Sequence, residues 1–278
     1  MRNIIPMKNK ILVPTDLTNA ADTALKQAVS IAKKINAGLI LVHVIPDDVK
    51  SHELAEMNLN AEAARVRKLY GIKCDTKLLK GHLMQVMEEL TCENDLCMMV
   101  VATHGIHGLR QRILGADILK LVAKVPMPVL VVQENAPVIE EFKKIVLPVA
   151  SHYSFHAAID AVSKIAVHYN SEVHLYSIRK EGFEWPEQLL KNIDHATRSF
   201  EGRNIRFKRV KEEQTVYSQG YAKQTLHYAK SVKADTVCIM SIPSRDYYYF
   251  AQADKESTLL NDFQLPVLCA GGGHEEPK

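Results

Sequence analysis

One strand-like run occurs twice in this chain. Residues 9–14, Asn-Lys-Ile-Leu-Val-Pro, return as residues 143–148, Lys-Lys-Ile-Val-Leu-Pro, and the Pro-Val-Leu run at Pro128 returns at Pro266. The spacing between the copies drifts by only a few residues from beginning to end. Such internal similarity constrains the fold more than any single motif does, because both copies have to build the same unit. It predicts a tandem duplication, with one domain over residues 1–136 and a second over residues 137–278.

Each copy alternates apolar runs with stretches of helical spacing. Continuous apolar runs are typical of strands that are covered on both faces, and their alternation with helices predicts a doubly wound parallel sheet. A proline at the head of the last run favours a sheet edge. In the predicted helix at 51–69, Leu54, Met57, Ala61 and Ala64 lie on one side. The predicted strands cover 10–16, 39–44, 72–79, 97–103 and 128–132 in the first copy, and 143–148, 173–178, 205–210, 236–240 and 266–269 in the second.

Composition narrows the class of protein. A net charge of +3 with 24% charged residues gives no electrostatic reason to expect a nucleic-acid partner. The five cysteines are scattered, without metal or redox spacing, which indicates reduced thiols and a cytoplasmic location. The first ten residues lack an apolar signal core, and no apolar run approaches the length of a membrane span. We therefore expect a soluble protein without a membrane partner.

A glycine loop follows the fourth predicted strand of the first copy. Residues 100–103 are apolar and strand-like, Gly105 and Gly108 lie in the loop, and a helix begins near Gly115. The first amides of a helix have no partner within it, the helix dipole favours negative charge, and glycine lets a ligand approach closely. The pattern therefore predicts an anion site in this loop.

These features together resemble the universal stress protein family. The resemblance rests on Val-Pro-Thr-Asp at 13–16, Leu-Val-His-Val at 41–44, the glycine loop, and Pro-Val-Leu-Val-Val at 128–132. It extends over both halves, and the first half matches more closely. It implies two α/β domains, each a five-stranded parallel sheet of order 3-2-1-4-5 with helices on both faces. Some members bind ATP where the strand order reverses, and others bind no nucleotide.

The resemblance also implies how the two copies meet. In the family, the last strand commonly pairs antiparallel with its copy across a dimer interface. A tandem chain satisfies this pairing internally if Val129–Val132 meets Val267–Cys269, which would remove two exposed sheet edges. The single chain would then be a pseudo-dimer, and a further homodimer is compatible with the sequence without being predicted by it.

The phosphate end of the family's nucleotide site is altered here. The family pattern is Gly, two residues, Gly, nine residues, Gly, then Ser or Thr, and it reads Ala102, Gly105, Gly115 and Ala116 in this sequence. Ala102 adds a methyl group where a ribose would lie. Ala116 lacks the hydroxyl that would donate to a phosphate, a loss of about 1.5–3 kcal/mol, or roughly one to two decades in affinity. We therefore expect adenine-nucleotide binding that is weakened rather than abolished.

The adenine end is better preserved. By resemblance, Asp16 accepts a hydrogen bond from the adenine amino group, the backbone of Val44 contacts the ring edge, and His104 lies beside the nucleotide. A plain capping role for Asp16 at the next helix remains open, because a carboxylate is favoured there in any case. The candidate nucleotide site comprises Pro14, Thr15, Asp16, Val44, Ala102, His104, Gly105, Gly108, Gly115 and Ala116.

The second copy has lost the site residues. Ala150 stands in place of Asp16, and the segment after the fourth strand has no glycine before Gly271. Tyr247–Tyr249 stand where the first copy has its loop, and we expect them to pack in the vacated pocket or against the other domain. We predict no ATP in this half.

The sequence shows no strong catalytic constellation. It contains no Gly-Lys-Ser/Thr phosphate loop, no Gly-x-Ser-x-Gly elbow and no His-Glu-x-x-His pair. His104 and His107 lack a third ligand at short spacing, so no metal is predicted. The favoured hypothesis is a stress-response regulatory or binding protein whose first domain binds ATP or a related adenine nucleotide. The alternatives are a ligand-free interaction module and a slow ATPase.

Overall fold

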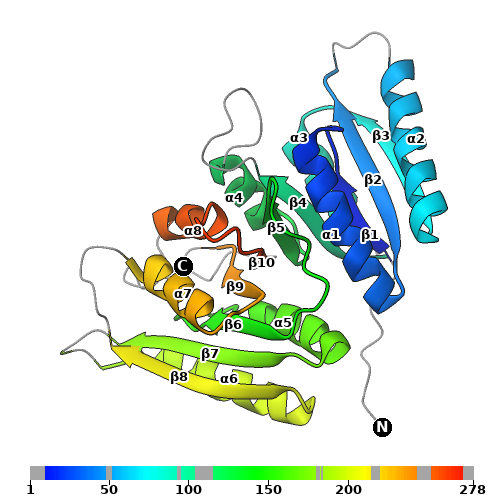
Figure 1. Ribbon diagram of the computed structural model, residues 1–278. Coiled ribbons are helices and arrows are strands. Elements are labelled where there is room, and N and C mark those ends of the chain that lie inside the picture. Colours follow the sequence, from blue (N-terminus) through cyan, green and yellow to red (C-terminus); the bar gives the residue numbers. More distant parts are fainter. Residues whose placement is uncertain are drawn as a thin grey trace.

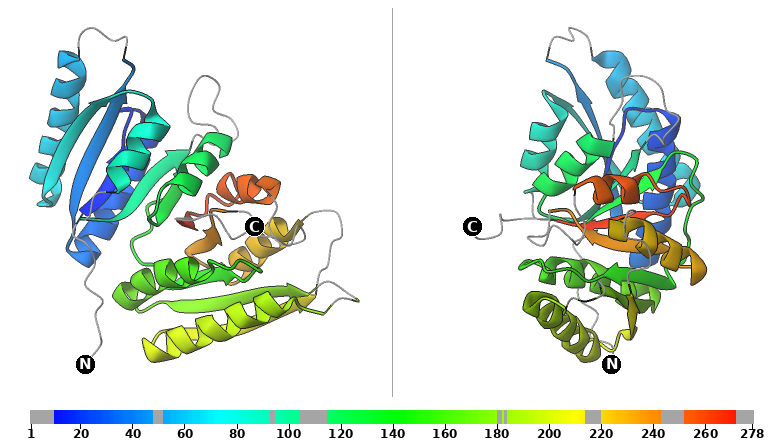
Figure 2. Two further views of the ribbon diagram at one scale, coloured as in Figure 1. Left: turned by 180° about the vertical axis from the view of Figure 1, so that it is seen from behind. Right: turned by 90° about the vertical axis from the view of Figure 1, so that its left-hand side faces the viewer.

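A computed structural model describes residues 10–47, 52–92, 95–103, 115–179, 182, 184–213, 220–242 and 252–271. Within these residues, ten strands form one continuous sheet of order β3-β2-β1-β4-β5-β10-β9-β6-β7-β8 (Figure 1). The sheet twists strongly, so that β7 and β8 run in a clearly different direction from β2 and β3 (Figures 1 and 2). The fold is the predicted α/β arrangement of two doubly wound units, with their two sheets joined into one.

The first repeat has the order β3-β2-β1-β4-β5, with all neighbours parallel. The order reverses at β1, which lies between β2 and β4. This agrees with the order 3-2-1-4-5 that the resemblance implies. The elements are β1 (Lys10–Pro14), α1 (Asn19–Ile35), β2 (Gly38–Ile45), α2 (Glu53–Tyr70), β3 (Cys74–Lys80), α3 (Leu83–Thr91), β4 (Leu96–Thr103), α4 (Gly115–Lys124) and β5 (Val129–Gln133).

The second repeat has the matching order β8-β7-β6-β9-β10, again with parallel neighbours. Residues 134–143 join the two repeats, and the exact domain boundary at residue 136 stays a prediction. The elements are β6 (Lys144–Pro148), α5 (His156–Tyr169), β7 (Glu172–Arg179), α6 (Glu187–Gly202), β8 (Arg206–Glu213), α7 (Gly220–Ser231), β9 (Thr236–Met240), α8 (Gln252–Leu259) and β10 (Val267–Ala270).

The two repeats meet through their last strands. β5 and β10 pair antiparallel, with Leu130 opposite Leu268 at the centre of the register. Helix α1 contacts α5 on one face of the sheet, and α4 contacts α8 on the other. The predicted pairing of these two strands is therefore confirmed. Pro128 precedes a strand at the edge of its own repeat, and that edge is closed by β10 rather than open to solvent.

Local sequence explains how β1 and α1 place the edge where the candidate site lies. Ile11, Leu12 and Val13 of β1 are fully buried, as expected for a strand between two helical layers. Thr18 is the N-cap of α1, and its side chain accepts from the amide of Ala21. The helix ends at Asn36, which adopts the left-handed conformation. Between the end of β1 and the start of α1, Leu17 also has a positive φ, of 62°, which turns the chain sharply there.

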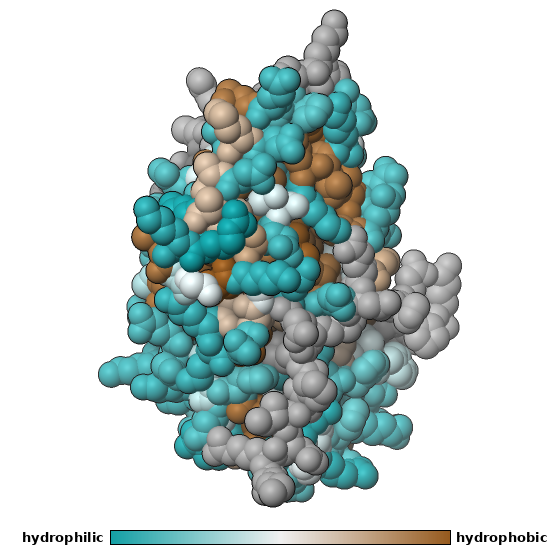
Figure 3. All heavy atoms as spheres, turned by 90° about the vertical axis from the view of Figure 1, so that its right-hand side faces the viewer, coloured by the Kyte–Doolittle hydropathy of each residue, from teal (hydrophilic) through white to brown (hydrophobic). Residues whose placement is uncertain are grey.

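Helix α2 buries a different face from the one that the sequence predicts. Leu54 is 66% exposed and Met57 is 62% exposed, whereas Leu59, Ala63 and Val66 are buried. The buried residues follow the i, i+4, i+7 spacing of a narrow stripe against β2 and β3. Because α2 covers only the outer strands, the rest of its surface faces solvent. Figure 3 looks at the side of the molecule on which α2 lies, where apolar atoms show between polar ones.

Candidate nucleotide site

A cavity of about 220 Å³ lies at the carboxyl ends of β1, β2 and β4 in the first repeat. Its position is the point at which the strand order reverses, which is where open α/β sheets bind ligands. Its apolar wall comes from both helical layers as well as from the strands. The cavity is lined by Pro14, Thr15, Asp16, Thr18, Ala20, Ala21, Val42, His43, Val44, Leu83, Val101, Ala102 and Leu121.

The structure brings half of the predicted site residues together in this cavity. Pro14, Thr15 and Asp16 follow β1, Val44 lies near the end of β2, and Ala102 lies near the end of β4. His104, Gly105 and Gly108 lie outside the described residues. Gly115 and Ala116 form the first backbone turn of α4. A ligand role for these residues stays a prediction.

Asp16 is held at the mouth of the cavity by its neighbour. One carboxylate oxygen, Oδ1, accepts from the amide of Thr18 at 3.1 Å and from its hydroxyl at 2.5 Å. Thr18 rather than Asp16 is therefore the N-cap of α1. Within the described part of the chain, the second oxygen, Oδ2, has no hydrogen-bond partner. The carboxylate thus braces the start of the helix with one of its two oxygens.

His43 is a cavity residue that the list of candidates does not contain. Its Nδ1 lies 2.6 Å from the carbonyl oxygen of Thr15, so this nitrogen donates to a backbone acceptor. The amide of Thr15 in turn donates to the carbonyl of Val42 at 2.8 Å. These two bonds fasten the loop after β1 to β2. The signal for His43 is in the sequence, since it is the only polar residue in an otherwise apolar strand, 39–44.

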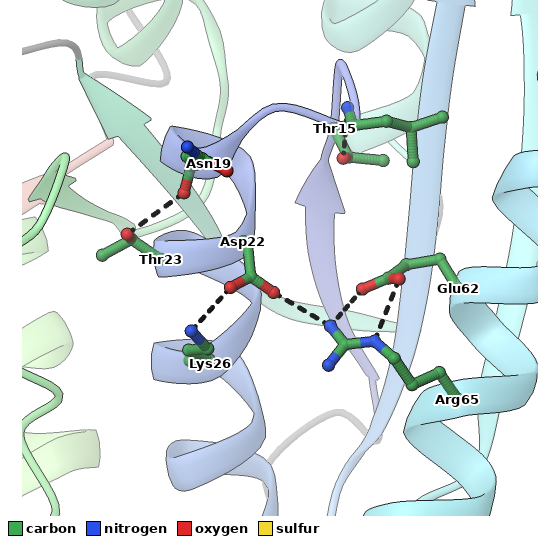
Figure 4. A network of polar contacts seen from close by, with 8 residues as sticks. Thr15, Asn19, Asp22, Thr23, Lys26, Glu62 and Arg65 are labelled. Carbon is green, nitrogen blue, oxygen red and sulfur yellow. Dashed lines mark hydrogen bonds and ion pairs between the residues drawn. The ribbon is translucent and has the colours of Figure 1, made fainter.

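A polar network on the helical layer holds α1 beside the cavity (Figure 4). The guanidinium of Arg65, on α2, donates to Asp22 of α1 at 2.9 Å and to Glu62 of its own helix. Asp22 also pairs with Lys26 at 2.6 Å. The hydrogen bond with Glu62 is the main reason that the pKa of Arg65 is raised above its usual range. The pairs are partly exposed, so we assign them a role in orientation more than in stability.

The equivalent place in the second repeat is surrounded by buried residues. The amide of Val149 donates to the carbonyl of Tyr176, as Thr15 does to Val42, which aligns Ala150 with Asp16. Ala150 and His152 are buried, and the amide of Asn192 donates to both of their carbonyls at 2.7 and 2.8 Å. Lys255 of α8 is also fully buried. The loop after β6 is therefore closed over the end of its strand, and the predicted tyrosine cluster, Tyr247–Tyr249, lies outside the described residues.

Strand register identifies a further difference between the repeats. Leu130 of β5 and Leu268 of β10 are equivalent residues, paired at the centre of the joint. Two residues after each of them are Val132 and Ala270. Ala102 of β4 lies opposite Val132, and Met240 of β9 lies opposite Ala270. Ala102 and Met240 are therefore equivalent positions. Met240 is buried, and its side chain is longer than that of Ala102, which lines the cavity of the first repeat. The absence of ATP binding in the second repeat stays a prediction. The larger side chain of Met240 supports this prediction.

The described residues show neither a metal-binding cluster nor a candidate membrane span. No three His, Cys, Asp or Glu side chains among them are grouped so as to hold a metal ion. No helix within the same ranges is long and apolar enough to cross a membrane.

Comparison with known proteins identifies the family. The model of the universal stress protein family matches residues 7–133. A universal stress protein of Methanocaldococcus jannaschii is 28% identical over 150 residues, which cover 48% of this chain and 87% of that protein. The crystal structure of a universal stress protein from Archaeoglobus fulgidus has the same fold, with a TM-score of 0.75 at 16% identity over 96% of this chain and 99% of its own.

One further neighbour was solved with a nucleotide. It is a universal stress protein in complex with cAMP, 20% identical, which covers 46% of this chain and 99% of its own with a TM-score of 0.39. Family membership itself rests on the sequence matches in the first repeat. The first repeat, over residues 7–133, belongs to the universal stress protein family.

Proposed function

We propose that the first repeat binds an adenine nucleotide as a regulatory ligand. The observation that carries the proposal is the meeting of five predicted residues, from three strand ends, around one cavity. The three strand ends are far apart in the sequence, and the order of the strands in the sheet brings them together. The proposal makes the protein a nucleotide-dependent stress-response regulator, whose second repeat serves as a structural partner.

The lining suits the base of a nucleotide. Val42, Val101 and Leu121 offer apolar contacts to a flat ring, and Asp16 offers its second carboxylate oxygen to an exocyclic amino group. In this proposal the backbone of Val44, which also lines the cavity, contacts the ring edge. In this arrangement the phosphates extend toward the first turn of α4, whose amides and dipole favour negative charge.

A binding role fits the titratable groups of the cavity better than a catalytic one. Asp16 and His43 are the titratable side chains among the lining residues. One carboxylate oxygen of Asp16 accepts a hydrogen bond from Thr18, and Nδ1 of His43 donates one to a backbone carbonyl. An acid and a base that face each other across a reacting group are not present among these residues. We therefore propose that the bound nucleotide regulates the protein by occupying the cavity. Hydrolysis of the nucleotide is a separate question, to be measured separately.

Calorimetric titration of the full chain with ATP, ADP and AMP tests the proposed function. Asp16→Asn keeps an oxygen for Thr18 and replaces the other acceptor, so we expect about a tenfold to hundredfold loss of affinity. Ala116→Ser restores a hydroxyl and should tighten binding of ATP over a similar range. Asp160→Ala, an exposed carboxylate that pairs with Arg203 in the second repeat, is the matched control and should change nothing. The absence of binding at millimolar nucleotide, or equal affinity of Asp16→Asn and wild type, would sink the proposal.

A further inference from the structure

A second cavity, of about 170 Å³, lies between β7, β8 and α6 in the second repeat. Its floor is formed by Leu175 and Ser177 of β7, and α6 contributes the apolar side chains of Leu190 and Ile193. Trp185 closes one side, and its indole nitrogen lies 3.4 Å from the carbonyl of Ile178. This cavity is separate from the nucleotide cavity, which is confined to the first repeat.

Two cations line this cavity from one strand. Arg209 and Lys211 are two residues apart on β8, so they lie on the same face of the sheet. The guanidinium of Arg209 donates to the hydroxyl of Thr197 from Nε at 3.1 Å and from Nη2 at 2.8 Å, which fixes its plane. The ammonium of Lys211 lies 4.8 Å from the centre of the Trp185 ring.

The negative charge in the lining does not balance these cations. Asp194 of α6 is the one carboxylate among the lining residues. It forms an ion pair with Arg198, one turn further along the same helix, and this bond, together with the nearby charge of Arg209, holds the pKa of Asp194 below the usual range. The cavity therefore keeps an excess of positive charge beside an apolar wall.

The cation pair belongs to the second repeat alone. The equivalence of Val42 and Tyr176 makes Leu41 and His43 correspond to Leu175 and Ser177. In the first repeat, these positions lie opposite Thr76 and Leu78, and in the second they lie opposite Arg209 and Lys211. The fold itself therefore does not require the two charges, since the same register is built without them.

Size and chemistry together define a ligand class. A dry apolar cavity of about 150 Å³ is enough to hold benzene, and pockets for drug-sized ligands are larger, about 300–1,000 Å³. We propose that this cavity binds a small organic anion with a single ring, a monocyclic aromatic carboxylate. Its ring lies against Trp185, Leu190 and Ile193, and its carboxylate is bound by Arg209 and Lys211. This inference stands apart from the proposed nucleotide function.

Trp185 supplies the measurement, because it is the single tryptophan of the chain. We expect benzoate to change its fluorescence saturably, and neutral benzamide of the same shape to bind about tenfold more weakly. Arg209→Gln and Lys211→Gln should each weaken benzoate binding by about tenfold, which calorimetry checks independently of the fluorophore. Lys208→Gln is the matched control. The ammonium of Lys208 forms an ion pair with Glu172, and Lys208 is not among the residues that line this cavity.

Three outcomes would overturn the inference. They are no saturable signal up to millimolar benzoate, equal affinity for benzoate and benzamide, and benzoate binding that survives Arg209→Gln and Lys211→Gln unchanged. Asp16→Asn separates this site from the nucleotide site. We expect that variant to bind benzoate as the wild type does, whatever the result of the nucleotide titration.

Discussion

Lowering the pH from about 7.5 to about 5 is expected to destabilise the native protein by about 2 kcal/mol through His152 alone. His152 follows β6 in the second repeat and is 2% exposed. Burial, together with the nearby charge of Lys255, lowers its pKa to about 3 from an ordinary value of 6.5. The buried carbonyls around it are held by Asn192, so the loop has little freedom to move the ring toward solvent.

The direction of the effect follows from proton counting. Between pH 6.5 and pH 3, the unfolded chain binds a proton at this histidine and the folded chain does not. Acid therefore favours the unfolded state throughout that window. The contribution of His152 to the free energy of unfolding is fully present above pH 6.5 and is lost progressively as the pH falls toward 3.

Urea denaturation of wild type and His152→Asn across this pH range measures the effect. The wild type should lose about 2 kcal/mol more than the variant between the two pH values. His168 and His174 also have pKa values lowered by burial, but both are present in either protein and cancel in the comparison. Equal pH dependence of the two proteins would show that His152 is accessible to solvent in the native state.

Gly271→Ala is expected to destabilise the joint between the repeats by about 1–3 kcal/mol. Gly271 follows β10 and lies against the connection from α4 to β5 of the first repeat. An added Cβ would lie 2.8 Å from the carbonyl oxygen of Met127 and 2.9 Å from both the amide nitrogen of Met127 and the carbonyl oxygen of Val125. All three atoms belong to the backbone, so a side-chain rotation cannot relieve the contact.

Gly202→Ala provides the matched control for this substitution. Gly202 ends α6, and an added Cβ there meets no atom within 4 Å. That variant should be neutral or more stable by about 0.4–1 kcal/mol, because alanine narrows the unfolded ensemble. Denaturation midpoints of the two variants give the comparison directly. A Gly271→Ala protein as stable as Gly202→Ala would mean that the repeats separate easily at this contact.

Much of the fold could be predicted from the sequence, because its strands are long apolar runs with clear ends. The run that ends at Pro14 recurs as the run that ends at Pro148, and this recurrence predicted the duplication. The alternation of apolar runs with helical stretches predicted the parallel sheet. The family resemblance supplied the pairing of β5 with β10, which turns two sheets into one. The resemblance also named the candidate site residues, and five of them meet in one cavity because the strand ends of a doubly wound sheet converge at one edge.

Other features depend on contacts that local pattern does not encode. The apolar residues of α2 have helical spacing on both the predicted face and the observed one. The place of the helix at the sheet edge decides that Leu59 is buried and Met57 is exposed. The cavity at Trp185 combines a loop, a helix and a strand whose register sets Arg209 beside it. The closure of the second site by Asn192 is equally non-local, since its partners lie some forty residues earlier in the chain.

The most direct test of the account is to copy one residue of the second repeat into the first. The central claim is a single adenine-nucleotide site, at the cavity that Ala102 lines. Ala102→Met carries the side chain of Met240 to the equivalent position, and Met240→Ala is the reciprocal variant. Calorimetric titration with ATP should give one site per chain in wild type and in Met240→Ala, and no measurable site in Ala102→Met. Unchanged ATP binding by Ala102→Met, or a site lost in Met240→Ala instead, would contradict the account.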